Sequence, residues 1–189
     1  MSKLLGSDYL LLLLYLDNKK TIKGTVRLTK MMFLFNQEIA PLLTKKGIES
    51  DQLPQFIPYN FGPFSKDLSE QTEFFKNINF IKAKNIYARE EMAEVDDWEE
   101  GPFFGYDQSN SFNLDSKYIE YAIDDKGIKF VEQKILNQIS PEILNIIERF
   151  KNKIVKTSIK NILYYVYSNY PDYAKKSIIK DEVLGEDNE

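Results

Sequence analysis

The side chains with the most obvious capacity for chemistry lie in one acidic segment, residues 90–107. Seven carboxylates fall within its first eleven positions: Glu90, Glu91, Glu94, Asp96, Asp97, Glu99 and Glu100. Carboxylate oxygens are ligands that Mg²⁺ and Ca²⁺ prefer, so one interpretation is a metal site. The segment lacks the ligand spacing and the glycine of an EF-hand loop, and the simpler interpretation is a solvated acidic loop.

Four aromatic residues lie among these acids or just after them: Trp98, Phe103, Phe104 and Tyr106. Aromatic side chains, tryptophan and tyrosine above all, are frequent anchors at protein–protein interfaces. We therefore predict that the segment binds a protein partner. An acidic, aromatic loop would suit a basic partner, or it would imitate the phosphates of a nucleic acid. The alternative is that the four rings fold back and cover the neighbouring structure.

The sequence lacks two residue types on which many enzymes depend, because it contains no histidine and no cysteine. Ser–His and Cys–His triads and the HExxH zinc motif are thereby excluded. Asp125, Glu132 and Lys134 offer a nuclease-like set of two carboxylates and a lysine, but Glu132 falls within a predicted helix and not on a strand. We predict a non-catalytic protein without a cofactor. The absence of cysteine also fits a cytoplasmic protein.

Basic residues form two clusters that offer a different kind of site. The first holds Lys19, Lys20, Lys23, Arg27 and Lys30, and the second holds Arg149, Lys151, Lys153, Lys156 and Lys160. Together they would follow a phosphate backbone without reading bases, although each cluster is also typical of a solvated face. Only three arginines occur in the chain, and arginine is the usual reader of guanine. Sequence-specific DNA binding is therefore disfavoured.

Charge is segregated along the chain, although the formal net charge is only −4. Residues 1–89 carry 13 basic and 8 acidic side chains, whereas residues 90–125 carry 1 basic and 12 acidic side chains. Residues 126–180 carry 11 basic and 4 acidic side chains, and residues 181–189 carry 5 acids and no base. A basic body therefore holds an acidic insert and ends in an acidic tail, which we expect to be disordered.

Hydrophobic periodicity predicts a mainly α (α+β) fold. We expect helices at about 8–16, 25–38, 63–77, 125–135, 141–154 and 159–170, strands at 78–88 and 118–123, and a loop at 41–58 that contains one helical turn. The strands would form a β-hairpin with the acidic insert 90–107 at its tip. The longest apolar run, Tyr9 to Leu16, has eight residues, far fewer than the roughly 20 needed to cross a membrane.

Three helices followed by a hairpin and further helices are the order of a winged helix with a C-terminal helical extension. We therefore predict one winged-helix-like domain over residues 1–180, followed by the acidic tail 181–189. The third helix would be the DNA reader, but it carries three acids, Asp67, Glu70 and Glu73, against two lysines, Lys66 and Lys76. That balance would repel phosphates.

Four short motifs occur in order along the chain. They are GTVRLTKMMFL at 24–34, YNFGPFSKDL at 59–68, YAIDDKG at 121–127, and YPDY at 170–173 followed by Ser177. In this combination the chain resembles the YwgA-like family of small prokaryotic proteins, which is related to the Panacea (SocA-like) antitoxin domain. Ile123 and Asp124 stand where the family pattern has Leu and Thr, and the acidic insert replaces a short wing. The resemblance implies a winged-helix-like fold, toxin neutralisation or proteolytic-adaptor work, and no catalytic residues.

Two hypotheses about function follow. The first is a protein-interaction module, that is, an antitoxin, an adaptor or a defence-associated accessory factor. The alternative is a winged-helix DNA-binding transcriptional regulator, with an acid-dependent hydrolase or nuclease a distant third. Five tyrosines near the C-terminus would mostly pack in the core, with a minority free to form a homodimer surface: Tyr164, Tyr165, Tyr167, Tyr170 and Tyr173.

Overall fold

A computed structural model describes residues 2–87 and 117–185. The first part contains β1 (Ser2–Leu5), α1 (Gly6–Lys19), β2 (Ile22–Lys23), α2 (Thr25–Leu34), the π-helix η1 (Phe35–Ile39), α3 (Ala40–Lys45), β3 (Ile48–Asp51), β4 (Ile57–Tyr59), β5 (Gly62–Phe64), α4 (Lys66–Asn77) and β6 (Ile81–Tyr87). The second part contains β7 (Lys117–Ile123), α5 (Asp125–Phe130), the π-helix η3 (Val131–Ile135), the 3₁₀-helix η4 (Leu136–Gln138), α6 (Pro141–Lys156), α7 (Ile159–Asn169), α8 (Pro171–Ala174) and α9 (Lys180–Leu184). The mainly α prediction is confirmed.

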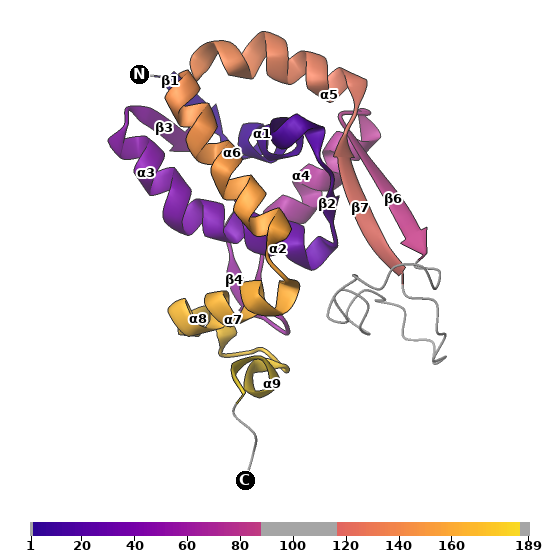
Figure 1. The fold of residues 1–189 in the computed structure, drawn as a ribbon, viewed down its shortest axis with the longest axis vertical. Helices are drawn as coiled ribbons and strands as arrows, with labels where there is room; N and C mark the ends of the chain where they lie inside the picture. The colour runs from indigo at the N-terminus through magenta and orange to yellow at the C-terminus, as the bar shows by residue number, and fades with distance from the viewer. Residues whose placement is uncertain (1, 88–116, 186–189) are drawn as a thin grey trace.

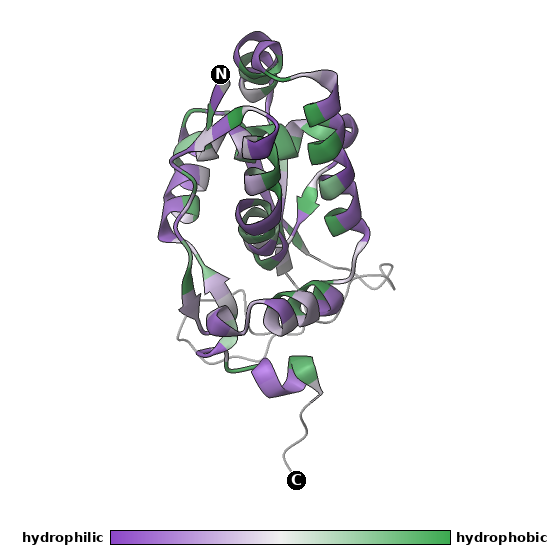
Figure 2. Ribbon diagram, turned by 90° about the vertical axis from the view of Figure 1, so that its left-hand side faces the viewer, coloured by the Kyte–Doolittle hydropathy of each residue, from purple (hydrophilic) through white to green (hydrophobic). Residues whose placement is uncertain are grey.

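Helix α1 lies at the centre of the molecule, with α6 crossing it and β7 and η3 packed beside it (Figure 1). Its leucines are fully buried without a break from Leu10 to Leu14, because the helix is surrounded on all sides. Figure 2 shows hydrophobic segments gathered towards this centre. The prediction that the apolar run from Tyr9 to Leu16 is a core helix is confirmed. In the described ranges, no helix combines the length and the hydrophobicity that a membrane crossing requires.

A three-stranded antiparallel sheet has the strand order β2–β7–β6. Strands β6 and β7 pair from Ile81 opposite Ile123 to Tyr87 opposite Lys117, which confirms the predicted hairpin. Strand β2 was not predicted. It consists of two residues between α1 and α2, which pair with Tyr121 and Glu120 of β7. That this arrangement is winged-helix-like stays a prediction.

Helices α6 and α7 begin at polar caps. The Ser140 hydroxyl accepts a hydrogen bond from the Ile143 amide at the start of α6, and the Ser158 hydroxyl accepts one from the Asn161 amide at the start of α7. Each hydroxyl satisfies an amide that has no partner within its helix.

The helical turn expected within 41–58 is present as α3 at its beginning. The loop predicted for the rest of the segment is wrong, because β3 pairs in parallel with β1 at the N-terminus, and β4 and β5 form a second hairpin. Pro63 belongs to β5 and is not the first residue of a helix, since α4 begins after Ser65, whose hydroxyl accepts the Leu68 amide. These elements depend on pairing between distant segments, which periodicity does not reveal.

The predicted disorder after residue 180 is also wrong for Asp181 to Leu184. These residues belong to α9, in which the Val183 side chain is buried and packs with the hydrophobic core. Val183 and the partly buried Leu184 hold this short helix against α7 despite its acidic composition.

Candidate functional site

The predicted partner-binding residues lie outside the described parts of the chain. They are Trp98, Phe103, Phe104 and Tyr106, together with the carboxylates of the insert 90–107. Their roles stay predictions. Among residues 2–87 and 117–185, no three or more Asp or Glu side chains lie close enough together to hold a metal ion.

The nuclease-like set is not assembled as such a site would require. Asp125 begins α5, and Glu132 lies in η3, which is helical as predicted. The Glu132 carboxylate is exposed and accepts a hydrogen bond from the Tyr15 hydroxyl at 3.2 Å. This geometry accounts for Glu132 as a surface contact between helices.

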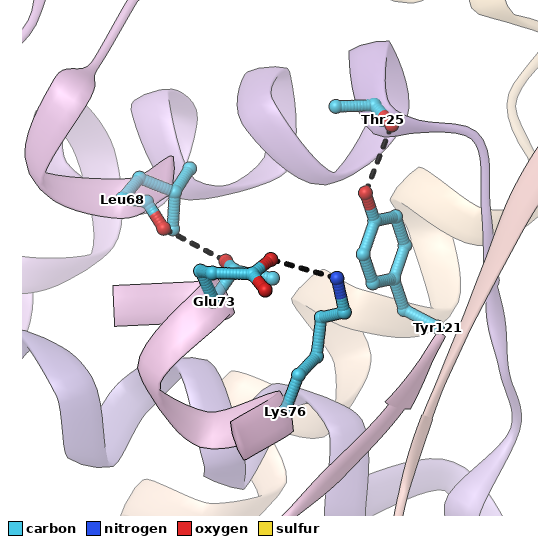
Figure 3. Close-up of polar contacts among 6 residues, drawn as sticks. Thr25, Leu68, Glu73, Lys76 and Tyr121 are labelled. Carbon is cyan, nitrogen blue, oxygen red and sulfur yellow. Dashed lines mark hydrogen bonds and ion pairs between the residues drawn. The ribbon is translucent and has the colours of Figure 1, made fainter. Parts of the chain in front are cut away.

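Helix α4, the predicted DNA reader, uses both of its lysines internally. Lys66 pairs with Glu70 at 3.1 Å, and Lys76 pairs with Glu73 at 2.7 Å, as Figure 3 shows for the second pair. Thr72 of the same helix is buried and donates to the Leu68 carbonyl at 2.7 Å. The outward face of α4 therefore offers little net positive charge to a phosphate.

Three residues of the two predicted basic clusters are buried, which corrects their assignment to a nucleic-acid surface. Arg27, Lys30 and Lys151 expose only 7%, 3% and 0% of their surface. A phosphate cannot reach these side chains without disrupting the fold. Each of them instead donates to one or two backbone carbonyls: those of Ile154 and Thr157 for Arg27, that of Pro63 for Lys30, and those of Leu16 and Lys20 for Lys151.

Arg27 holds the C-terminal end of α6. Its Nη1 donates to the carbonyl of Ile154 at 2.8 Å and also to the carbonyl of Thr157. The last carbonyls of a helix have no partner within the helix, and a cation there also offsets the negative end of the helix dipole. Because Arg27 lies in the first turn of α2, this contact joins the start of α2 to the end of α6.

Lys151 holds the end of α1 in the same way. Its Nζ donates to the carbonyls of Leu16 and Lys20, both at 2.7 Å. Between those residues Asp17, Asn18 and Lys19 adopt left-handed backbone angles, with φ of 55°, 53° and 58°. Three such residues in succession are costly for non-glycine residues and need support from their surroundings.

Two further side chains of α6 support the same turn. The Glu148 carboxylate accepts a hydrogen bond from the Asp17 amide at 2.9 Å, and the Asn152 side chain donates one to the Asp17 carboxylate at 3.2 Å. Burial lowers the pKa of Lys151 to about 8, while the carboxylates of Asp17 and Glu148 act in the opposite direction. Three side chains on one face of α6, those of Glu148, Lys151 and Asn152, therefore hold this turn in place.

The remaining residues of the two basic clusters are exposed and lie on elements that these contacts bring together. We call this set the basic face: Lys19, Lys20, Lys23, Arg149, Lys153, Lys156 and Lys160. The end of α1 and β2 supply the first three, and α6 and α7 supply the others. Lys151 ties α6 to Lys20, and Arg27 ties α2 to the end of α6.

A second junction fixes the β4–β5 hairpin. Lys30 Nζ donates to the Pro63 carbonyl at 2.9 Å, and burial lowers the pKa of Lys30 to about 7. Gly62 has φ of 82°, and a Cβ atom there would lie 2.6 Å from Cε1 of Tyr167. The Tyr167 and Ser177 hydroxyls are hydrogen-bonded at 2.9 Å, and burial raises the pKa of Tyr167 to about 12. We call these five residues the hairpin junction.

The outer surface beside this junction is apolar. Ile57, Tyr59 and Ile178 are 55%, 38% and 72% exposed, and we call them the hairpin patch. Ile57 and Tyr59 point to one side of β4, since side chains alternate along a strand. The Ile178 amide donates to the carbonyl of Asn60, the residue after Tyr59, at 2.9 Å. This patch was not predicted from the sequence, because most of β4 falls within the predicted loop.

The C-terminal tyrosines divide between core and surface. Tyr167 is buried and Tyr170 and Tyr173 are partly buried, whereas Tyr164 and Tyr165 are exposed. The hydroxyls of Tyr165 and Tyr170 both donate to Oε1 of Glu38 at 2.9 Å. Tyr165 is therefore held against η1, although its ring remains accessible.

A groove of about 390 Å³ lies between the segment before β4 and the first turns of α4. Its lining is Gln52, Leu53, Gln55, Asp67, Glu70 and Gln71. The Gln55 amide donates to Asp67 at 2.9 Å, and Gln71 Oε1 is buried without a hydrogen-bond partner in the described structure. The lining is rich in hydrogen-bond acceptors, and its lone ion-paired carboxylate, Glu70, is held by Lys66.

No protein-family model matches the chain, and no curated protein matches it.

Proposed function

We propose that the protein is a non-catalytic protein-interaction module, of the kind that serves as an antitoxin, an adaptor or a defence-associated accessory factor. It binds a protein partner at the hairpin patch. The observation that carries this proposal is the exposure of Ile57, Tyr59 and Ile178 on adjoining backbone segments. Apolar side chains gathered on a surface are a mark of interaction sites, whereas apolar residues exposed singly are ordinary.

The rigidity of the hairpin supports the same proposal. Lys30 and Tyr167 hold its backbone from the inside, and the Ile178 amide ties the C-terminal segment to its turn. A surface that is already ordered loses less conformational entropy when a partner binds. Isoleucine and tyrosine on such a surface can act as anchors, with tyrosine the more frequent hot spot.

The aromatic residues of the insert are a second proposed contact with the partner. Trp98, Phe103, Phe104 and Tyr106 supply the residue types that anchor interfaces, and the surrounding acids favour a partner with a basic surface. This part of the proposal rests on the sequence.

The test compares surface variants of the full chain in affinity purification from native-host extracts. We expect one partner to bind the wild type and to be lost from the Ile57→Ser/Ile178→Asp double variant. Leu42→Ser is the matched control, because Leu42 is also an exposed apolar side chain but lies on α3. Binding of the purified partner should then weaken at least tenfold in the double variant alone.

Equal binding of the partner to all variants would refute the hairpin patch as its site. Failure to recover any partner would refute the proposal as a whole. Sedimentation of the wild type and the double variant tests for dimerisation. Concentration-dependent dimers that disappear in the double variant would show that a second copy of the chain binds the hairpin patch.

The alternative, a DNA-binding regulator, is favoured by one observation, the assembly of the basic face. The paired lysines of α4 weigh against a sequence-reading helix at that position.

A further inference from the structure

We infer that the basic face is a separate binding surface, which follows the phosphate backbone of duplex nucleic acid without reading its bases. This goes beyond the proposed function, because the basic face and the hairpin patch share no residue. The two surfaces would allow the protein to hold a protein partner and a nucleic acid at once.

The fold brings together basic residues that are distant in the sequence. The residues of the basic face come from two segments, 19–23 and 149–160, that are far apart in the chain. They are joined because Lys151 binds the carbonyls of Leu16 and Lys20, and Arg27 binds the carbonyl of Ile154. The buried side chains of Arg27 and Lys151 thus hold together the segments that carry the exposed bases.

Most of these charges have no ion-pair partner in the described part of the chain, although Lys19 Nζ lies over the Tyr15 ring at 5.3 Å. Within residues 2–87 and 117–185, six bases of the face form no ion pair: Lys19, Lys20, Lys23, Arg149, Lys153 and Lys156. The neighbouring acids have other partners, since Glu148 accepts the Asp17 amide and Glu120 accepts the Thr21 hydroxyl at 2.8 Å. Within the described residues, the six bases therefore have no ion-pair partner, although Glu148 and Glu120 keep their negative charge beside them.

The residue types of the face indicate the class of anion. Lysine acts as a point charge towards phosphate, whereas guanine edges are read mainly by arginine, and the face contains a single arginine. Attachment to a membrane surface would require apolar side chains beside the bases, and no large exposed hydrophobic residue belongs to described segments 19–23 or 149–160. Phosphates of a nucleic-acid backbone fit this surface best.

The dimensions also suit a duplex. Arg149 and Lys156 are separated by about 10 Å along α6, at roughly 1.5 Å per residue. Duplex DNA carries one negative charge per roughly 1.7 Å of its axis, so several phosphates lie within reach of the face. If the six unpaired bases each neutralise one phosphate, the logarithm of the binding constant falls with the logarithm of salt concentration with a slope of about −5.

The test is fluorescence anisotropy with full-length protein and two labelled 24-base-pair duplexes of unrelated sequence, at salt concentrations from 25 to 200 mM. We expect both duplexes to bind with equal affinity and a steep salt dependence. The Lys153→Gln/Lys156→Gln variant should bind both more weakly, and its salt slope should be shallower by about 2. The control Lys126→Gln/Lys129→Gln changes the net charge equally on α5 and should bind as the wild type does.

Three results would overturn the inference: no duplex binding at 25 mM salt, equal loss in the α5 control, or a strong preference for one duplex. Stronger binding to vesicles with anionic headgroups than to duplex would assign the face to a membrane surface and would also overturn it. The Ile57→Ser/Ile178→Asp variant should bind duplex normally. The failure of one proposal is therefore distinguishable from the failure of the other.

Discussion

The end of α1 and the β4–β5 hairpin are two irregular stretches of backbone, and each is held by one buried lysine. At the end of α1, Lys151 binds two carbonyls on either side of three left-handed residues. At the hairpin, Lys30 binds the carbonyl of Pro63, next to the left-handed Gly62. In both places a long flexible side chain carries hydrogen-bond donors to backbone that no regular element can satisfy.

The two regions differ in what surrounds the lysine. Carboxylates of Asp17 and Glu148 act on Lys151, whereas burial alone acts on Lys30, and the pKa of Lys30 is accordingly the lower of the two. Outside Lys151 the surface is basic, and outside Lys30 it is apolar. The same kind of internal contact therefore lies beneath both of the surfaces that we propose as binding sites. In each case the proposed binding residues are other than the buried lysine.

The largest expected effect separates a buried lysine from an exposed one on the same helix. Lys151→Met leaves the Leu16 carbonyl without its donor in a buried position, and we expect a loss of about 2–3 kcal/mol in the free energy of unfolding. Lys153→Met, two residues away on the exposed face, should change stability by less than about 0.5 kcal/mol. Urea denaturation of both variants at pH 7 makes the comparison. Equal losses would show that Lys151 does not hold the turn.

The next effect isolates the contact that fixes the hairpin. Gly62 and Gly47 have nearly the same backbone angle, φ of 82° and 88°, but only Gly62 faces Tyr167. Gly47→Ala should cost about 1 kcal/mol for the backbone alone. Gly62→Ala adds overpacking against a buried ring, and we expect a further loss of about 1–3 kcal/mol. Thermal unfolding of the two variants measures the difference. Similar melting temperatures would mean that the hairpin moves to accommodate the methyl group.

Local signals in the sequence predicted part of this fold correctly. Ser140 and Ser158 mark helix starts because a capping hydroxyl acts within its own first turn. The β6–β7 hairpin was visible as two apolar stretches on either side of a charged insert. Strand β2 and the parallel β1–β3 pair were not visible, since two to four residues become strands only when a distant partner is present.

The candidate sites were harder to predict, because composition does not distinguish a buried cation from an exposed one. Lys151 follows Phe150 and lies four residues after Ile147 and three before Ile154, so it borders the apolar stripe of α6. That position was the available signal for burial. The carbonyls that Lys151 meets belong to α1, and no periodicity in the sequence names them. The hairpin patch likewise depends on pairing between β4 and β5.

The dependence of stability on pH compares the two buried lysines directly. Lysine in the unfolded chain keeps its proton up to its ordinary pKa of 10.5, whereas the folded pKa is about 7 for Lys30 and about 8 for Lys151. Between those values the unfolded state binds more protons, so stability rises with pH, at most by about 1.4 kcal/mol per pH unit for each lysine. Tyr167 acts oppositely above pH 10, because its folded pKa is raised to about 12.

Denaturation between pH 6 and 11 should therefore show a stability maximum near pH 10. Lys30→Met should remove the increase in stability that begins near pH 7. The increase that begins near pH 8, which comes from Lys151, should remain. A Lys30→Met profile parallel to that of the wild type would contradict a lowered pKa for the Lys30 ammonium group.

The smallest expected effect concerns the surface beside the hairpin junction. Ile178→Ser and Ile57→Ser remove apolar side chains that remain mostly in contact with water, so each should change the free energy of unfolding by less than about 0.5 kcal/mol. A loss of about 1 kcal/mol or more in chemical denaturation would mean that these side chains are packed as core. An unchanged stability together with lost partner binding would separate the inside of the hairpin from its outside, since Gly62→Ala would then damage the fold and Ile178→Ser would damage recognition alone. Lys153→Gln is the corresponding variant at the basic face. Binding at each surface can therefore be weakened separately in a protein that keeps Lys30 and Lys151.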